Sequence, residues 1–307
     1  MIEDEDMKLI LNICDEYDYY APAEFAKIVK QAGFDGADMG LFRMKNQEHP
    51  WNGANWPEHA ENLKSAYLDA GVPFVQTHAP FNFKQMDDPG FVADVYYPTM
   101  IRSIEFSAAL GAQYVIVHPM HHIPYYENRQ ELFEMNMEQY RKLIPVAKSN
   151  GIKIAVENMF QRDKLRGGHV VDSTCSRPEE FCRYVDTLDS DYIVACLDIG
   201  HTTLISGNAS PDEYIRILGH ERLKTLHVHD NDYKSDRHVI PFSGLIDWYQ
   251  VTKALGEINY TGDMVYECLI DRVANKMDPS QYPAVLEYMA KIGKHLIEQV
   301  EMNRKSI

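Results

Sequence analysis

Histidine and carboxylate side chains recur at the ends of the short apolar segments of this chain. They are His78, His118, Glu157, Asp198, His201, His227, His229, Asp230 and Glu267. Imidazole and carboxylate ligands without thiolate suit Mn²⁺, Co²⁺, Zn²⁺ or Mg²⁺. A single residue of this kind is usually a hydrogen-bonded or ion-paired part of the fold. Their collective meaning therefore depends on whether the fold brings the segment ends together.

The apolar segments are rich in Val, Ile and Tyr and alternate with amphipathic segments along the whole chain. Their first residues lie roughly 30–40 residues apart, which is the length of one strand–loop–helix unit. Strands are predicted at residues 8–13, 36–40, 73–78, 114–119, 153–159, 192–201, 223–230 and 263–268.

The segments between these strands have the periodicity and the end signals of helices. Apolar residues follow the i, i+3, i+4, i+7 spacing at Phe25, Ile28, Val29 and Ala32. Proline stands at expected first-turn positions and glycine at expected left-handed positions after helices. These residues are Pro22, Pro178, Pro211, Gly33, Gly71, Gly111 and Gly151.

Eight strands that each precede a helix favour a parallel sheet, and eight such units favour a closed (β/α)8 TIM barrel over an open sheet. No linker or low-complexity tract divides the chain, so we expect residues 1–307 to form a single domain. Alternation along the strands would turn Glu157, Asp198 and Glu267 inward, at the rim where strands end. Like charges gathered there repel unless a cation neutralises them, so the sequence predicts a metal site.

The composition argues against several classes of protein. The 307 residues include 46 acidic and 30 basic residues, for a formal charge of −16, which opposes broad contact with nucleic acid phosphates. No run of about 18 apolar residues is present, and the acidic start lacks the apolar region of a secretory signal. The five scattered cysteines are typical of reduced thiols. We therefore expect a cytoplasmic protein without a membrane span.

The stretches around the candidate ligands form a series along the chain. They are QTHAPF, VIVHP, AVEN, LDIGH, HVHDN, SDRH followed by GLIDW, and VYE. In order and spacing they resemble the xylose-isomerase-like TIM barrel superfamily over nearly the whole chain. That superfamily unites sugar and sugar-phosphate isomerases and epimerases, related dehydratases, and DNA repair enzymes of the endonuclease IV class.

In the epimerases of this superfamily, one divalent metal is held by residues from strands five to eight. Motif by motif, the resemblance places these ligands at Glu157 of AVEN, Asp198 of LDIGH, His227 of H-x-x-D and Glu267 of VYE. His229 lies two residues beyond His227 and faces the same way in a strand, so the choice between them stays open. The substrate contacts that we expect are His78, His118, Asp163, His201, His229, Asp236 and His238.

The trinuclear zinc pattern of the endonuclease IV class also maps onto this chain. Its ligands would be His78, His118, Glu157, Asp198, His201, His227, Asp236, His238 and Glu267. Where members of the superfamily commonly carry P-G-x-G after D-x-H, this chain has IPFSG at 240–244. The charge of −16 and the lack of a lysine- or arginine-rich rim argue against binding to DNA.

We therefore expect a metal-dependent sugar isomerase or epimerase that works through an enediolate, with Glu157 and Glu267 as the pair that moves protons. A dehydratase or other lyase acting on a sugar or polyol derivative is the nearest alternative. The repair nuclease is a further alternative, and so is a barrel that has lost catalysis and serves as a sugar-binding or complex-forming subunit. The expected partner is a small-molecule sugar.

Two loops have open interpretations. Residues 160–177 are long and polar, which fits either a solvated loop or a lid over the substrate. Trp51 and Trp56 follow the second strand and would stack on a sugar, cap the barrel or form a dimer contact. Because we expect these aromatic residues to be exposed on rim loops, we also expect a homo-oligomer.

Overall fold

The computed structural model describes residues 6–14, 19–205, 207–268 and 277–304. Eight parallel strands form one sheet in the order β10-β1-β2-β3-β4-β5-β8-β9. They are β1 (Leu9–Ile13), β2 (Gly36–Gly40), β3 (Phe74–His78), β4 (Tyr114–Ile116), β5 (Lys153–Glu157), β8 (Ile193–Asp198), β9 (Leu223–His227) and β10 (Met264–Tyr266).

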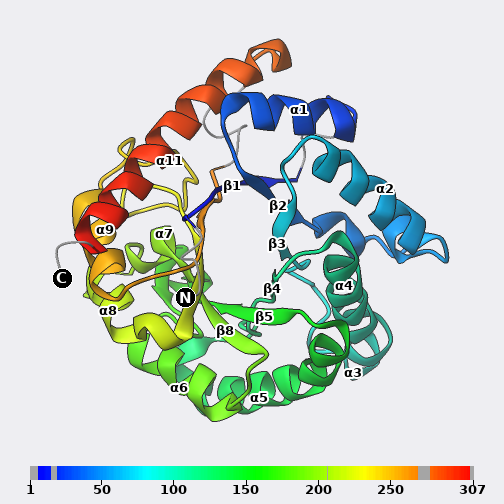
Figure 1. Ribbon diagram of the computed structural model, residues 1–307. Coiled ribbons are helices and arrows are strands. Elements are labelled where there is room, and N and C mark those ends of the chain that lie inside the picture. Colours follow the sequence, from blue (N-terminus) through cyan, green and yellow to red (C-terminus); the bar gives the residue numbers. More distant parts are fainter. Residues whose placement is uncertain (1–5, 15–18, 206, 269–276, 305–307) are drawn as a thin grey trace.

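The two end strands of this sheet meet and close a barrel. Val228, directly after β9, forms a parallel bridge with Tyr266 of β10. The Val228 N–H donates to the Val265 carbonyl at 2.8 Å, and the Glu267 N–H donates to the Val228 carbonyl at 3.2 Å. The predicted (β/α)8 TIM barrel is thereby confirmed, and Figure 1 shows the strands at its centre.

Helices form a ring around the strands (Figure 1). They are α1 (Pro22–Ala32), α2 (Trp56–Asp69), α3 (Pro89–Phe91), α4 (Tyr97–Leu110), α5 (Tyr125–Asn150), α6 (Pro178–Leu188), α7 (Ile199–Thr202), α8 (Pro211–Arg222), α9 (Trp248–Glu257) and α11 (Tyr282–Arg304). Shorter turns are η2 (Phe42–Lys45), η3 (Pro50–Asn52), η4 (Val92–Tyr96), η5 (Lys164–Arg166) and η6 (Pro279–Gln281). None of the described helices is long and apolar enough to cross a membrane.

The predicted helix signals act where they were expected. Pro22, Pro178 and Pro211 each occupy the first turn of a helix. Gly33 has φ +106° after α1, and its N–H bonds to carbonyls of the last turn of that helix. Only a residue that tolerates the left-handed region fits there at little cost. The strands predicted at 192–201 and 223–230 end earlier, at Asp198 and His227, because α7 and an irregular segment begin there.

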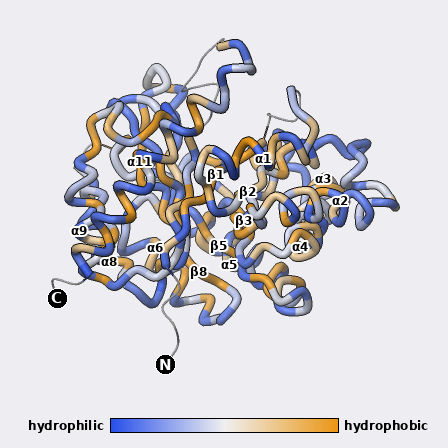
Figure 2. The backbone as a smooth tube through the Cα atoms, turned by 45° about the horizontal axis from the view of Figure 1, so that its top comes forward, coloured by the Kyte–Doolittle hydropathy of each residue, from blue (hydrophilic) through white to orange (hydrophobic). Residues whose placement is uncertain are grey.

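Alternation along the strands separates two apolar layers, as the sequence predicts. Ile116, Ala155, Val194 and Cys196 pack together inside the barrel. Ile154, Val156, Leu197 and Tyr266 point outward and belong to the larger core between strands and helices. Figure 2 shows apolar strands surrounded by helices of mixed hydropathy. The small interior cluster leaves the carboxyl rim of the barrel to polar side chains.

Two segments differ from their expected form. Residues 160–177 contain an antiparallel hairpin of β6 (Phe160–Asp163) and β7 (His169–Asp172), rather than an irregular loop.

Trp51 and Trp56 are half-buried, because their rings pack on Phe106 at 5.0 and 6.1 Å. These tryptophans cap the outer core. The exposure from which a homo-oligomer was predicted is therefore not found at these two residues, and the homo-oligomer stays a prediction.

Candidate metal centre

Four predicted ligands meet at the carboxyl ends of neighbouring strands. Glu157 ends β5, Asp198 ends β8, His227 ends β9 and Glu267 follows β10. One ligand atom from each lies within 4.8 Å of those of the other three. His227 Nδ1 lies 3.1 Å from Glu157 Oε1 and 3.4 Å from Glu267 Oε2. We call these four residues the His227 group.

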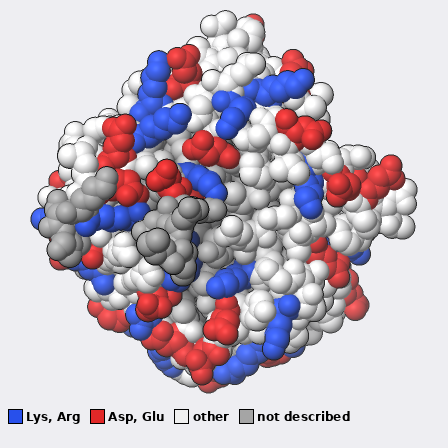
Figure 3. Space-filling view, viewed as in Figure 1, with Lys and Arg blue, Asp and Glu red and all other residues white. Residues whose placement is uncertain are grey.

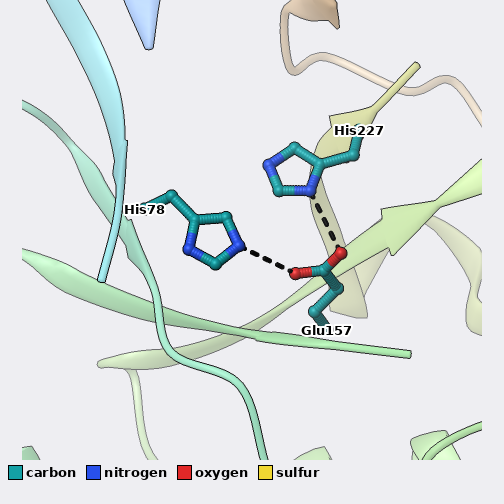
Figure 4. A group of neighbouring side chains, drawn as sticks. All are labelled: His78, Glu157 and His227. Carbon is teal, nitrogen blue, oxygen red and sulfur yellow. Dashed lines mark hydrogen bonds and ion pairs between the residues drawn. The ribbon is translucent and has the colours of Figure 1, made fainter. Parts of the chain in front are cut away.

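Two further histidines approach the same glutamate from β3 and β4. His118 Nε2 lies 2.9 Å and His78 Nε2 3.4 Å from Glu157 Oε2. Figure 4 shows Glu157 between His78 and His227, one carboxylate oxygen turned to each ring. Among the described residues, Glu157 Oε2 nonetheless accepts no hydrogen bond. Nitrogen and oxygen ligand atoms therefore converge on Glu157, whose Oε1 is hydrogen-bonded to His227 and whose Oε2 is not hydrogen-bonded to any described residue.

A second group of side chains shares Asp198 with the first. His229 Nε2 lies 3.1 Å from both carboxylate oxygens of Asp198 and 3.6 Å from Asp236 Oδ1. His238 Nε2 lies 2.9 Å and His201 Nε2 3.7 Å from Asp236 Oδ2. We call this second set, which includes the shared Asp198, the His238 group: Asp198, His201, His229, Asp236 and His238. His229 thus belongs beside Asp236, whereas His227 faces the glutamates.

Local backbone features make room for the His238 group. A Cβ at Gly200, in the LDIGH stretch, would overlap the His229 imidazole. The Asp198 carboxylate accepts a hydrogen bond from the His201 N–H at 2.7 Å, which begins α7 and orients His201. His238 adopts φ +48°, a region that few residues with a side chain occupy and that is found at functional sites.

The IPFSG stretch keeps one of the two expected glycines in an essential place. A Cβ at Gly244 would overlap the Asn231 carbonyl and the Asp230 carboxylate. Asp230 in turn accepts a hydrogen bond from Trp248 Nε1 at 2.9 Å. Phe242 holds φ +69°, a left-handed conformation that glycine adopts freely and phenylalanine does not. Phe242, which stands where the family pattern has glycine, is therefore held in a strained backbone conformation.

A buried polar network supports His227 from inside the barrel. Gln76 Nε2 lies 3.1 Å from His227 Nε2, and it also donates to Asp38 Oδ2 at 3.3 Å. Asn12 donates to the same oxygen at 2.9 Å, and Thr225 donates to Gln76 Oε1. Because Nε2 is held from below, His227 presents Nδ1 to the carboxylates. The residues of this network were not among those predicted from the sequence.

The carboxylates of both groups are desolvated and crowded. Burial raises the pKa of Glu267, and the nearby negative charges of Glu157 and Asp198 raise it further. Burial also opposes ionisation of Glu157, but His227 and His118 outweigh it and hold the pKa of Glu157 well below its usual range. Burial likewise disfavours the charged form of Asp236, whose pKa is nevertheless lowered by His201 and His238.

The histidines respond to the same negative charge. Although burial opposes protonation, Glu267 and Glu157 raise the pKa of His227 to about 10, and Asp198 raises that of His229 to about 9. His118 is dominated by burial, which lowers its pKa to about 4. The buried oxygens Glu157 Oε2 and Asp236 Oδ1 accept no hydrogen bond from the residues that the structure describes. Buried carboxylates and converging nitrogen and oxygen donors fit a divalent cation.

A cavity of about 1110 Å³ opens above these groups. Of the predicted substrate contacts, His78, His118, Asp163, His201, Asp236 and His238 line it, whereas His229 lies beneath. Within the His227 group, Glu157 and Glu267 line the cavity, and Asp198 and His227 do not. Asp163 reaches it from β6 and also accepts a hydrogen bond from the Leu165 N–H at 2.8 Å.

Comparison with known proteins places the chain in a family. The model of the xylose isomerase-like TIM barrel family matches residues 26–292. The chain belongs to this family, as its motifs and closed barrel indicate.

Curated relatives match part of the chain. It is 29% identical to the uncharacterized protein y4fM of Sinorhizobium fredii over 173 residues, which cover 55% of this chain and 51% of the relative. It is 27% identical to a probable endonuclease 4 of Staphylococcus saprophyticus over 175 residues, 54% of each chain. The chain thus spans about half the length of these curated relatives.

Solved structures with the same fold cover nearly the whole chain. A D-tagatose 3-epimerase-like protein has a TM-score of 0.69 and 23% identity, covering 98% of this chain and 99% of its own. The 3-keto-D-glucoside 4-epimerase YcjR of E. coli has a TM-score of 0.66 and 18% identity, covering 93% and 100%. The IOLI protein with a bound zinc atom has a TM-score of 0.67 and 16% identity, covering 97% and 99%. These similarities establish the fold.

Proposed function

We propose that the protein is a divalent-metal-dependent epimerase or isomerase of a keto sugar. One observation carries this proposal: of the four ligands in the His227 group, the two glutamates line the cavity, while Asp198 and His227 lie beneath it. Carboxylates that face both a metal and a substrate are suited to moving a carbon-bound proton. The solved sugar epimerases of the same fold support the same assignment.

Glu157, Asp198, His227 and Glu267 would hold one Mn²⁺, Co²⁺, Zn²⁺ or Mg²⁺ ion. When bound, such a cation supplies Lewis acidity that polarises a substrate carbonyl. One glutamate takes the proton from the carbon beside that carbonyl, which gives an enediolate. The other glutamate returns a proton. Return to the opposite face of the same carbon is epimerisation, and return to the neighbouring carbon is isomerisation.

The other lining residues would position the substrate. His78 and His118 approach Glu157, and His201 and His238 approach Asp236, so each presents a ring nitrogen near the rim. Sugar hydroxyls both donate and accept hydrogen bonds, which matches this mixture of imidazole and carboxylate groups. The same arrangement would also assist loss of a leaving group, so a dehydratase is the closest alternative reaction.

The repair nuclease is the second candidate because all nine residues of its zinc pattern lie in the two groups or beside them. Against it stands the formal charge of −16. On the face shown in Figure 3, acidic and basic side chains are interspersed and no continuous basic stripe is seen. Binding to a DNA backbone requires such a positive footprint.

The deciding experiment is deuterium uptake from heavy water by a panel of ketoses, followed by NMR for both epimers. We expect uptake by the metal-loaded wild type, and a loss of about 10²–10⁴-fold in Glu157→Gln and Glu267→Gln. Each variant is assayed with its metal content measured, since glutamine keeps the size of the side chain but not its basicity. The exposed Glu179→Gln, at the start of α6, is the control.

Two results would reject the proposal. Unchanged uptake in both variants with metal still bound would move the proton chemistry to His201 or His229. Three tightly bound zinc ions together with cleavage of abasic DNA would instead assign the protein to the nuclease class.

A further inference from the structure

The cavity extends well beyond the His227 and His238 groups. Its volume is about 1110 Å³, whereas pockets for drug-sized ligands measure about 300–1,000 Å³. A free hexose has only about a dozen non-hydrogen atoms, so it fits a pocket near the lower end of that range of volumes. A sugar placed at the carboxylates therefore leaves room for a second chemical group.

The walls of this additional space are apolar. We call them the apolar arm: Phe81, Phe83, Met120, Met159 and Phe160. The arm begins beside the polar side chains of the rim. The centre of the Phe81 ring lies 4.6 Å from that of the His118 ring, and the centre of the Phe160 ring lies 4.9 Å from that of the His201 ring. Aromatic rings and thioethers pack well on flat, apolar groups.

Two apolar side chains at the edge of the cavity are exposed although they line it. Leu165, in the turn of the β6–β7 hairpin, is 99% exposed. Tyr126, at the start of α5, is 50% exposed, and its hydroxyl donates to Asp172 at 2.6 Å. A fully exposed leucine contributes almost nothing to the buried core. Its apolar surface is instead available to a ligand that enters the arm.

The charges around the cavity do not suit an anionic ligand group. Among the described lining residues, the lysine and arginine side chains are Arg162 and Lys164, both on the hairpin. Arg162 Nη1 already donates to the Gly168 carbonyl at 3.3 Å. Glu127 and Asp163 also line the cavity as further acidic residues. A phosphate or nucleotide in the arm would meet more negative than positive charge.

We propose that the substrate is a glycoside: a keto sugar at the carboxylates, joined to an apolar aromatic aglycone in the apolar arm. This inference rests on the proposed function, of which it specifies the substrate class. Because a glycosidic bond blocks the anomeric carbon, the carbonyl lies at another ring carbon.

The reaction of such a substrate is balanced without an oxidant or a reductant. The C–H bond beside the ring carbonyl breaks, its proton passes to one glutamate, and its electron pair enters the enediolate. A proton from the other glutamate returns to that carbon on the opposite face. The glycosidic bond stays intact, so the aglycone remains in the arm throughout.

Binding of paired glycosides tests the arm without requiring turnover. Isothermal titration of metal-loaded protein is carried out with the methyl and the phenyl glycosides of glucose, galactose and xylose, and with glucose 6-phosphate. For at least one sugar we expect the phenyl glycoside to bind on the order of tenfold tighter than its methyl counterpart, from the apolar area that it buries. Glucose 6-phosphate should bind no better than free glucose.

Leu165→Ser should reduce the preference for phenyl by about fivefold, by removing apolar contact. It should leave the thermal stability unchanged, since Leu165 is exposed. Leu68→Ser is the matched control: Leu68 is 55% exposed on α2, outside the cavity lining, and should not alter the preference. No phenyl preference for any of the three sugars, or tighter binding of the sugar phosphate, would overturn the inference. These glycosides have no carbonyl and therefore test binding alone. Absent deuterium uptake by the whole ketose panel would instead reject the proposed function and leave the binding preference measurable.

Discussion

The His227 group and the His238 group share Asp198 but stand on different kinds of backbone. The His227 group occupies the ends of β5, β8, β9 and β10 and rests on Gln76 inside the barrel. The His238 group draws Asp236 and His238 from the irregular segment after β9, where His238 is left-handed and both side chains are partly exposed.

This difference in backbone suits the two groups to different roles, one to binding a metal and the other to contacting a substrate. Ligands on strand ends are fixed by ladder hydrogen bonds and by the apolar interior, so their geometry is set before a cation arrives. Side chains on an irregular segment adapt more easily to a variable ligand. We therefore propose that the His227 group holds the metal and that His201, Asp236 and His238 contact the substrate.

The largest expected effect is a difference in metal content between the groups. Glu157→Gln should bind metal poorly, because it removes a charged ligand from the buried His227 group. Asp236→Asn should retain one metal ion per chain, because Asp236 lies outside that group. Metal content after extensive dialysis checks both. Full occupancy in Glu157→Gln would remove the distinction, and a loss in Asp236→Asn equal to that in Glu157→Gln would merge the groups into one centre.

A smaller effect is expected from the network beneath His227. Gln76→Met keeps a similar size but removes the contact to His227 Nε2 and the hydrogen bond to Asp38. Metal affinity should fall by about 10–100-fold, as is typical when a partner that orients a ligand is lost. Competition with a chelator measures it. Gln113→Met, at an exposed position, is the control, and an equal affinity in the two variants would show that β9 alone orients His227.

The smallest effect concerns the segment that carries the His238 group. Phe242 holds a left-handed φ of +69° and is 42% exposed, with its ring 5.7 Å from that of Tyr249. Phe242→Gly should raise the free energy of unfolding by about 1 kcal/mol if relief of strain exceeds the added freedom of the unfolded chain. Chemical denaturation measures it, with metal affinity unchanged. A destabilised variant would show that the ring contact outweighs the strain.

Local patterns in the sequence predicted most of the fold. Alternation assigned Ala155 and Cys196 to the barrel interior and Ile154 and Leu197 to the outer layer, because each strand has a period of two. The β6–β7 hairpin was not predicted as strands, because its residues are polar and partly exposed and bury little of either face.

The same period explains what the sequence left undecided in the site. His227 and His229 lie two residues apart, so alternation places both on one face. Which of them faces the glutamates depends on their depth along the barrel and on Gly200, whose missing Cβ leaves room for the His229 ring. Asp38 was overlooked because it is the single polar residue of an apolar strand, and Gln76 because it precedes His78, the expected site residue of its own strand. An inward-facing carboxylate in GADMG was the available signal.

The bridge that closes the barrel lies directly at the proposed metal ligands. Val228 stands between His227 and His229, and its carbonyl accepts the N–H of Glu267. A cation held by His227 and Glu267 would therefore connect β9 and β10, the two end strands of the sheet, across the junction that closes the barrel. Metal occupancy and resistance to global unfolding would then be thermodynamically linked. Amide hydrogen exchange at Val228 and Glu267 would report how often this junction opens.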